Sequence, residues 1–288
     1  MNTLQLLEEK RKKTMQTMLL GYGICIGIAL LVMLISMSFP FGLIAFVISL
    51  IVAEASVING ARNEFVLEYK RILLEGQLKE VFDDIQVDFE RGFSEDEVEG
   101  WCLVDTHERF YSDDYVTGSY HGIQFRRIDV KIQDVRRSGK NTTVVTTFEG
   151  PWMIFEFGKR FTHYTVVKEK EFLDNGIPGG FWSGYEAEKI QTEDMRFNDK
   201  FVVFSTDGQE AFYLLNPTMM EKIIELESRL EGRLYLGFID GEFHVALDNR
   251  ENAFEPSVFE EISNYSINRV RDEIEAIKEL VELVESVC

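Results

Sequence analysis

The 288-residue chain has the length of about two ordinary domains, or of one domain with a membrane anchor. Hydrophobic residues make up 45% and prolines number only 5, which excludes a disordered or low-complexity chain. The 50 acidic and 30 basic residues give a formal charge of −20, which argues against nucleic acid or anionic lipid head groups as the main ligand. Three cysteines, at positions 25, 102 and 288, have the spacing of neither a disulfide framework nor a zinc site, and this favours a reducing compartment.

A run of 40 residues from Thr14 to Ala53 contains no charged side chain. A single membrane-crossing helix needs only about 20 residues, so the run is long enough to cross twice. Ser38 and Pro40 lie in its middle, where they predict a break between two helices. We therefore predict a transmembrane helical hairpin over residues 14–61, with spans at about 17–37 and 41–57.

Four basic residues at positions 10–13 precede the apolar run, as they would in a signal peptide. The run is too long for a signal peptide, and no small-residue cleavage pattern follows it. Lysine and arginine collect on cytoplasmic flanks, and the turn near Ser38 has none, so residues 1–13 are expected in the cytoplasm. Two crossings return the chain, which predicts a multi-pass protein of the cell (inner) membrane with both termini cytoplasmic.

Small residues recur four apart on both predicted spans, a pattern that lets helix backbones approach closely. The rows are Gly23 and Gly27 on the first span and Ala45, Ser49 and Ala53 on the second. In an antiparallel hairpin the two rows are expected to pack on each other. The alternative is that they face another copy of the chain and form a homo-oligomer, with Glu54 near a pore mouth.

The acidity of the chain belongs to the part after the hairpin. The first 61 residues hold 4 basic and 3 acidic side chains, which leaves 26 basic and 47 acidic residues and a net charge of −21 in the remainder. Apolar residues at helical spacing from Arg62 to Ile85 predict a helix leaving the membrane, within a connecting segment at 62–92. Residues 93–288 then form the predicted cytoplasmic domain.

This domain is predicted to be α+β, with a mainly antiparallel sheet packed with helices. Apolar residues alternate from Ile123 to Phe125 and again from Ile128 to Ile132, and Arg126-Arg127 interrupts the alternation as a bulge would. Asp240-Gly241 joins the clearest hairpin, over 234–239 and 242–247. Further strands are expected at 143–148, 152–157, 164–168 and 201–204.

Several helices accompany the strands. Thr218 and Glu221 have capping-box spacing at the start of a helix that runs to about Leu230, and another short helix is expected to start at Asp207. From Ile267 the apolar residues follow a heptad, which is typical of a coiled-coil dimer. The apolar stripe is wider than a strict seam, which favours packing on the sheet instead. Residues 175–180 are glycine-rich and are expected to form a loop.

Three segments resemble a known family, the bacterial membrane-anchored proteins that carry the domain of unknown function DUF3137. These segments are Asp113–Phe125, Phe148–Phe157 and Phe201–Leu215. The resemblance covers most of the chain from about Glu64 onward, and Gly208-Gln209 departs from the family, whose members have glutamine directly after the aspartate. It implies two amino-terminal spans, a cytoplasmic domain and a bacterial cell membrane, but no activity, because the family has none to transfer.

The sequence contains no zinc-binding spacing, phosphate-binding loop or nucleophile elbow. Asp105, His107, Asp113 and Asp114 are weak candidates for a hard-metal site, because short carboxylates and an imidazole can converge in a loop. No cofactor is predicted. We expect a non-enzymatic, membrane-tethered binding or scaffolding module with a protein partner. The alternatives are a metal-dependent enzyme acting on a membrane or envelope precursor and a small oligomeric channel or transport accessory.

Overall fold

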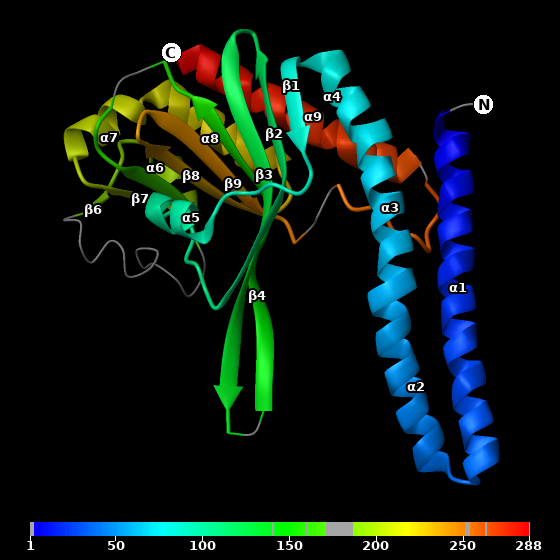
Figure 1. The fold of residues 1–288 in the computed structure, drawn as a ribbon. Coiled ribbons are helices and arrows are strands. Elements are labelled where there is room, and N and C mark those ends of the chain that lie inside the picture. The colour runs from blue at the N-terminus through cyan, green and yellow to red at the C-terminus, as the bar shows by residue number, and fades with distance from the viewer. Residues whose placement is uncertain are drawn as a thin grey trace. The chain divides into compact units, whose positions relative to one another are not determined.

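A computed structural model describes residues 3–139, 141–158, 161–170, 187–250, 254–262 and 264–287 (Figure 1). The chain forms two compact units, one of residues 1–77 with 254–271 and the other of residues 78–253 with 272–288. This division differs from the boundaries expected from composition, because the segment 254–271 returns to the first unit. The loop expected at 175–180 lies outside the described residues.

The first unit contains two long apolar helices joined by a tight turn. Helix α1 is Thr3–Ser36 and helix α2 is Phe39–Ala53, with Pro40 in the first turn of α2 and Met37 at a φ of +50° between them. Proline fits the first helical turn because its missing N–H has no partner there. The break predicted at Ser38–Pro40 is confirmed, and both helices are long and apolar enough to cross a membrane.

The helical path continues beyond α2 without a break. It passes through the π-helical segment η1 (Glu54–Ile58), helix α3 (Asn59–Tyr69), the π-helical segment η2 (Lys70–Glu75) and helix α4 (Gly76–Val81). The predicted helix over 62–85 is therefore right up to Val81 and wrong beyond it. The chain bends at Phe82, and Ile85 belongs to strand β1 (Asp83–Asp88), where Asp84 has a φ of +53° within a register shift between Asp83 and Gln86.

The second unit is built on one antiparallel sheet with the strand order β1-β2-β3-β4-β9-β8-β5-β7-β6 in the described residues. Every strand pair in it is antiparallel, which confirms the predicted α+β class. The strands are β1 (Asp83–Asp88), β2 (Arg109–Tyr120), β3 (Ile123–Ser138), β4 (Asn141–Glu156), β5 (Thr165–Glu169), β6 (Glu188–Ile190), β7 (Phe201–Ser205), β8 (Arg233–Ile239) and β9 (Glu242–Asp248).

The predicted bulge at Arg126-Arg127 is wrong. Both residues pair in regular register with β4, and the irregularity lies in the neighbouring strand β2, between Asp113 and Val116. The alternation in β3 changes because both faces of the sheet are covered. Arg127 is fully buried on one face, and Ile128 is fully buried on the other.

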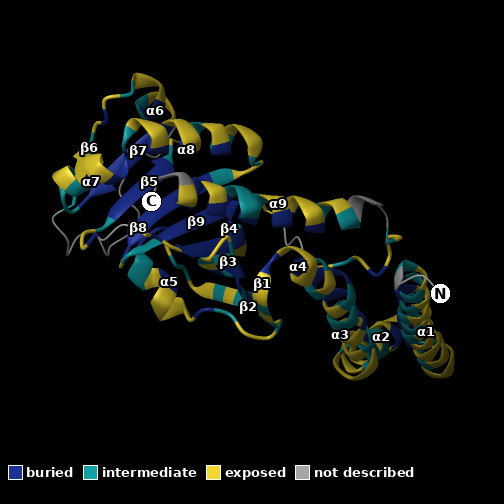
Figure 2. Ribbon diagram, turned by 90° about the horizontal axis from the view of Figure 1, so that it is seen from above, coloured by how far each residue is buried: buried dark blue, intermediate teal, exposed yellow. Residues whose placement is uncertain are grey.

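Helices cover both faces of the sheet (Figure 2). Helix α5 (Glu95–Trp101) lies on one face, over a core that includes Ile128, Phe148 and Trp152. Helix α8 (Pro217–Arg229) lies beside the part of helix α9 (Asn264–Val287) that follows Asp272, on the other face. Helices α6 (Met195–Lys200) and α7 (Gly208–Leu214) flank β7 in sequence.

Polar side chains cap these helices. Asp207 accepts a hydrogen bond from the Glu210 amide at 2.7 Å, which confirms the predicted helix start at α7. Helix α8 starts one residue before the predicted capping box. Its cap is Asn216, which accepts from the Met219 amide at 3.0 Å, because Pro217 occupies the first helical position.

The apolar stripe at the end of α9 is buried within a single chain. Ile274, Ile277, Leu280, Val281 and Val284 are each at most 4% exposed. This favours packing on the sheet over a coiled-coil dimer, as the width of the stripe predicts.

Candidate functional sites

The contact between the two apolar helices does not use the predicted glycine row. A Cβ atom on Gly42 would lie 2.9 Å from the Cβ of Met33 and 3.0 Å from the carbonyl oxygen of Ala29, so α1 and α2 approach closely there. Apart from the neighbouring backbone of α1 itself, no atom of the described residues lies within 4 Å of such a Cβ on Gly23 or Gly27. The prediction that their row packs on the second span is therefore wrong for these two glycines.

The second row lies nearer to the helix contact. Ala45, Ser49 and Ala53 are partly buried, and Ala53 packs against a cluster that contains Met18 and Ile58. On α1 the close glycine contact lies at Gly21 instead, where a Cβ would lie 3.2 Å from the Ile58 side chain. The predicted packing sites thus divide into a partly buried set on α2 and an exposed pair on α1.

Tyr22 and Glu54 link the two helical arms of the hairpin. The Tyr22 hydroxyl donates a hydrogen bond to Glu54 Oε1 at 2.8 Å. Glu54 is the first residue of η1, and π-helical turns inside α-helices are frequent at functional positions. An ionisable side chain beside an apolar span needs such a polar partner, because the span offers no other.

The basic residues before the apolar run have different roles. Arg11 is only 3% exposed and donates to the Val258 carbonyl oxygen at 2.7 Å and to Glu8 at 2.7 and 2.9 Å. It therefore fixes the returning segment to α1 within the first unit. Lys10 forms an ion pair with Glu68 of α3.

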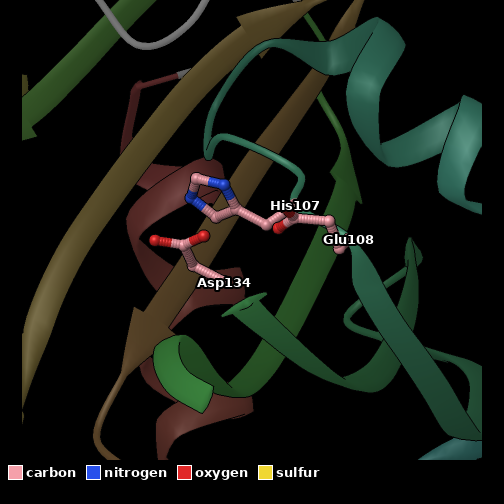
Figure 3. Close-up of side chains that lie close together, drawn as sticks. All are labelled: His107, Glu108 and Asp134. Atoms are coloured by element: carbon pink, nitrogen blue, oxygen red, sulfur yellow. The ribbon is translucent and has the colours of Figure 1, made fainter. Parts of the chain in front are cut away.

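The metal-ligand candidates separate into two groups, and Asp105 belongs to neither. In the first, oxygen or nitrogen atoms of His107, Glu108 and Asp134 lie within 4.8 Å of one another (Figure 3). Both carboxylates are also engaged elsewhere. Glu108 accepts from the Val135 amide at 3.1 Å, and Arg136 donates to Asp134 at 2.7 Å, a hydrogen bond that lowers the pKa of Asp134.

The second group places Asp113 and Asp114 beside Asp129, around a buried arginine. Arg127 donates to the two carboxylate oxygens of Asp129 at 2.6 and 2.9 Å and to Glu273 of α9 at 3.3 Å. Burial lowers the pKa of Arg127, but the charges of Asp129 and Glu273 outweigh burial and raise it. The group thus already contains a permanent cation, which joins β3 to α9.

Sequence reasoning missed this charged cluster, which we call the Arg127 cluster: Arg127, Asp129, Glu273 and Asp114. The available signal was an arginine followed two residues later by an aspartate within an apolar strand. Such a pair lies on one face of a strand, and a charge there needs a partner if that face is buried. Nothing in the sequence identifies Glu273, more than 140 positions away, as the other partner.

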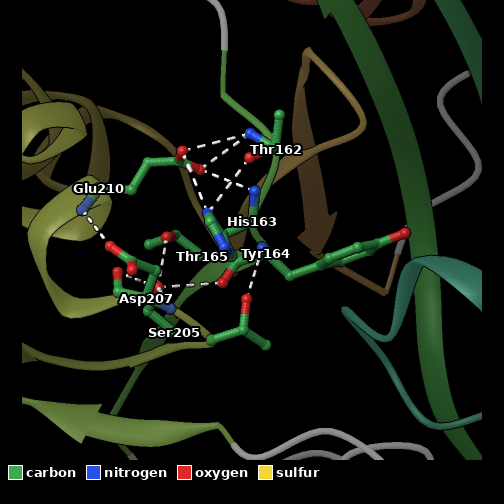
Figure 4. A network of polar contacts seen from close by, with 8 residues as sticks. Thr162, His163, Tyr164, Thr165, Ser205, Asp207 and Glu210 are labelled. Carbon is green, nitrogen blue, oxygen red and sulfur yellow. Dashed lines mark hydrogen bonds and ion pairs between the residues drawn. The ribbon is translucent and has the colours of Figure 1, made fainter.

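A polar network surrounds the start of α7 (Figure 4). The Glu210 carboxylate accepts from the amides of Thr162 at 3.1 Å and His163 at 2.8 Å. The buried Ser205 hydroxyl lies 2.9 Å from that of Thr165 and 2.8 Å from the carbonyl oxygen of Asp207. These bonds fasten the loop before β5 to the helix start, which is a structural use of the polar residues.

Two other titratable groups are buried without charge. Burial raises the pKa of the Cys102 thiol to about 12, and the thiol contacts the carbonyl oxygens of Glu99 and Gly100 at 3.2 Å. Burial, assisted by the charge of Arg126, lowers the pKa of His244 to about 3. At neutral pH Cys102 is therefore a thiol and His244 a neutral imidazole, and neither is activated for nucleophilic chemistry.

The fold thus defines an α+β protein with an apolar helical hairpin and a nine-stranded antiparallel sheet in the described residues. Residues 146–287 match the model of a family described as "Protein of unknown function (DUF3137)". The resemblance to this family is thereby confirmed over residues 146–287, just under half of the chain. Two of the three resembling segments lie within the match, whereas Asp113–Phe125 precedes it.

The chain is also similar to a solved structure, described as the crystal structure of the mycobacterial trehalose monomycolate transport factor A, TtfA. The identity is 10%, the match covers 73% of this chain and 93% of that chain, and the TM-score is 0.33. A likeness at this level defines neither a shared fold nor a shared function. No curated protein matches the chain.

Proposed function

We propose that this chain is a membrane-tethered, non-enzymatic binding or scaffolding module of the bacterial cell membrane. The observation that carries the proposal is the exposed apolar surface of both hairpin helices. Leu20 is 67% exposed, Ile35 is 76% exposed and Phe39 is 70% exposed. A helix of a water-soluble protein buries such a surface, whereas a membrane span presents it to lipid.

The orientation follows from the charges that flank the spans. Lys12 and Lys13 precede the apolar run, and the turn near Met37 has no charge. The amino terminus is therefore placed in the cytoplasm, and two crossings bring the second unit there as well. In this arrangement the lipid bilayer surrounds the hairpin, and the acidic second unit faces soluble partners.

The outer half of the β3–β4 hairpin is the surface we assign to partner binding. It extends beyond the rest of the sheet (Figure 1), and no described residue between Gln133 and Thr147 is buried. A two-stranded ribbon on its own is marginally stable, so an exposed one gains stability from a partner. Its sequence has three basic residues and one acidic residue, a charge of +2, while the rest of the chain has −22. The complementary partner is a protein with an acidic surface.

The test is co-purification of the full chain from membranes with and without Arg136→Glu and Arg137→Glu. Arg136 is 66% exposed, so the change should leave the fold intact. A reproducible partner should be captured by the natural chain and lost with the double variant. A control with Arg196→Glu and Lys222→Glu has the same change in charge at other exposed positions and should retain the partner. Capture of the same proteins by both variants would contradict the assigned surface.

A second candidate function is a metal-dependent activity at the group of His107, Glu108 and Asp134, favoured by the closeness of these three ligand types. Metal analysis of the purified chain tests it, with His107→Ala as the matched variant. Stoichiometric metal that is lost in the variant would support this candidate. Absence of metal, together with no thermal stabilisation by divalent ions, would remove it.

A further inference from the structure

A polar groove lies between α1 and α3 within the first unit. Its volume is about 220 Å³, and α1 and α3 each contribute four residues to it. These residues are Lys10, Lys13, Thr14 and Thr17 from α1, and Ala61, Glu64, Phe65 and Glu68 from α3. Phe65 is only 2% exposed and gives the groove an apolar floor.

The groove contains four charged residues, of which only two pair with each other. Lys10 and Glu68 form an ion pair across it. Lys13 and Glu64 form no ion pair with any residue that the structure describes. A ligand that has one anionic and one cationic group would complement both, whereas a simple anion would leave Glu64 unfavourably placed.

The position of the groove points to the source of that ligand. Lys10 and Lys13 precede the uncharged run and Thr14 and Thr17 lie at its start, so the groove lies at the cytoplasmic end of the first span in the proposed membrane arrangement. The Thr14 hydroxyl has no hydrogen bond within the described part of the chain, and it can donate to a phosphate oxygen. Head groups of membrane lipids lie at this level.

We propose that this groove binds the head group of a zwitterionic membrane lipid with a primary ammonium, of the phosphatidylethanolamine class. Its phosphate lies against Lys13 and the Thr14 hydroxyl, and its ammonium donates hydrogen bonds to Glu64. A quaternary ammonium has no N–H donor for this carboxylate, and a head group without a cation leaves Glu64 unpaired. The inference rests on the proposed insertion of the hairpin into a membrane.

Native mass spectrometry of the full chain in detergent tests the proposal. Phosphatidylethanolamine, phosphatidylcholine and phosphatidylglycerol are added at equal concentration. The first should be retained preferentially. Glu64→Gln should remove this preference, a loss of about threefold in relative binding, and Lys13→Gln should weaken the binding of all three lipids by about the same factor.

The two control residues, Glu9 and Lys12, each lie one position before a lysine of the groove. Lys12→Gln and Glu9→Gln change exposed residues outside the groove and should leave the preference unchanged. Equal retention of the three lipids, or the same effect from Glu9→Gln as from Glu64→Gln, would overturn the proposal.

Two further experiments distinguish a lipid from a soluble ligand and test membrane insertion independently. Soluble phosphoethanolamine has the same charged groups without acyl chains. If it binds as tightly as the lipid, the groove is a site for a soluble metabolite and the lipid assignment is wrong. Alkaline extraction of membranes tests insertion independently. If the chain resists extraction but shows no lipid preference, this inference alone is wrong. If alkaline treatment releases the chain, the proposed membrane function is wrong as well.

Discussion

The hydroxyl of Tyr22 and the carboxylate of Glu54 are 2.8 Å apart, although 32 positions separate them in the chain. This hydrogen bond joins the first apolar helix to the π-helical segment that follows the second. The sequence suggested a position near a pore mouth for Glu54. In the structure its carboxylate faces Tyr22 of the same hairpin. The hairpin is therefore a unit held by a polar contact as well as by the close approach at Gly42.

Replacing Tyr22 by phenylalanine should destabilise the hairpin by about 0.6 kcal/mol, the average for hydrogen bonds between membrane helices, and by no more than about 1.7 kcal/mol. Glu54→Gln keeps an acceptor oxygen and should cost less. Thermal unfolding of the full chain in detergent measures both, and the double variant should cost less than the sum of the two. Fully additive losses would show that the two side chains do not interact.

Leucine at Gly23 and Gly27 should leave the hairpin folded, because no described residue beyond the adjoining backbone of α1 lies within 4 Å of a Cβ at either position. Gly42→Leu is the matched contrast, since its Cβ would meet Met33 and Ala29 at 3.0 Å or less, and it should be strongly destabilising. Chemical cross-linking in membranes then reports the oligomeric state. Loss of an oligomer in the double variant Gly23→Leu/Gly27→Leu would support a homo-oligomeric channel or transport accessory. An unchanged state would leave that alternative without support.

The Arg127 cluster should be the most sensitive polar feature of the second unit. Arg127→Met leaves the buried carboxylates of Asp129 and Glu273 without their cation, which should cost about 3–5 kcal/mol. Arg126→Met is the matched control, because Arg126 is 33% exposed and pairs with a partly exposed Glu242, and should cost no more than about 1 kcal/mol. Denaturant unfolding of both variants measures the difference.

The cause of that loss can be tested separately. If the unpaired carboxylates are responsible, adding Glu273→Gln to Arg127→Met should restore part of the stability, because it removes one buried negative charge. A further loss in the double variant would show that packing around Arg127, rather than its charge, is what stabilises this region.

His244 should make the second unit less stable in mild acid. Its pKa is about 3 in the folded chain, mainly because of burial, and the ordinary value is 6.5. Below about pH 6.5 the unfolded chain gains a proton that the folded chain does not. The stability that neutral His244 contributes to the fold is therefore complete above this pH and is lost as the pH falls toward about 3. Each pH unit in that window costs about 1.4 kcal/mol.

The matched variant for this effect is His244→Gln, which does not titrate. Unfolding can be followed by the fluorescence of Trp101 and Trp152, whose rings contact the imidazole. Between about pH 6.5 and pH 5, the natural chain should lose roughly 2 kcal/mol more than the variant. Equal losses in both would show that His244 is protonated in the folded state.

Local patterns in the sequence predicted local structure well. The turn at Asp240-Gly241 and the helix start at Asp207 both follow from the backbone preferences of these residues, and both are present. Patterns that depend on what covers a surface were less reliable. Arg126-Arg127 resembled a bulge because the sequence does not reveal that α9 buries the face on which Arg127 lies.

Contacts between distant residues could not be predicted at all. The bond from Arg11 to Val258 joins positions 247 apart, and a single sequence gives no signal for it. The same holds for the grouping of Asp113 and Asp114 with Asp129, which the register of β2 on β3 creates. The glycine row on α1 was assigned to the wrong side because spacing alone does not reveal which face of a helix meets its neighbour, and the close contacts lie at Gly21 and Gly42.

The membrane hairpin is the central claim, and thiol labelling in intact cells tests it most directly. Cysteine is placed either at Met37, which is 91% exposed in the turn, or at Lys200 in the second unit, in a chain with Cys288→Ser. Cys25 and Cys102 are buried and should stay silent. A membrane-impermeant maleimide should label the cysteine at position 37 in intact cells, and the one at position 200 only after permeabilisation. Labelling of position 200 in intact cells, or of neither until the cells are opened, would contradict the hairpin model.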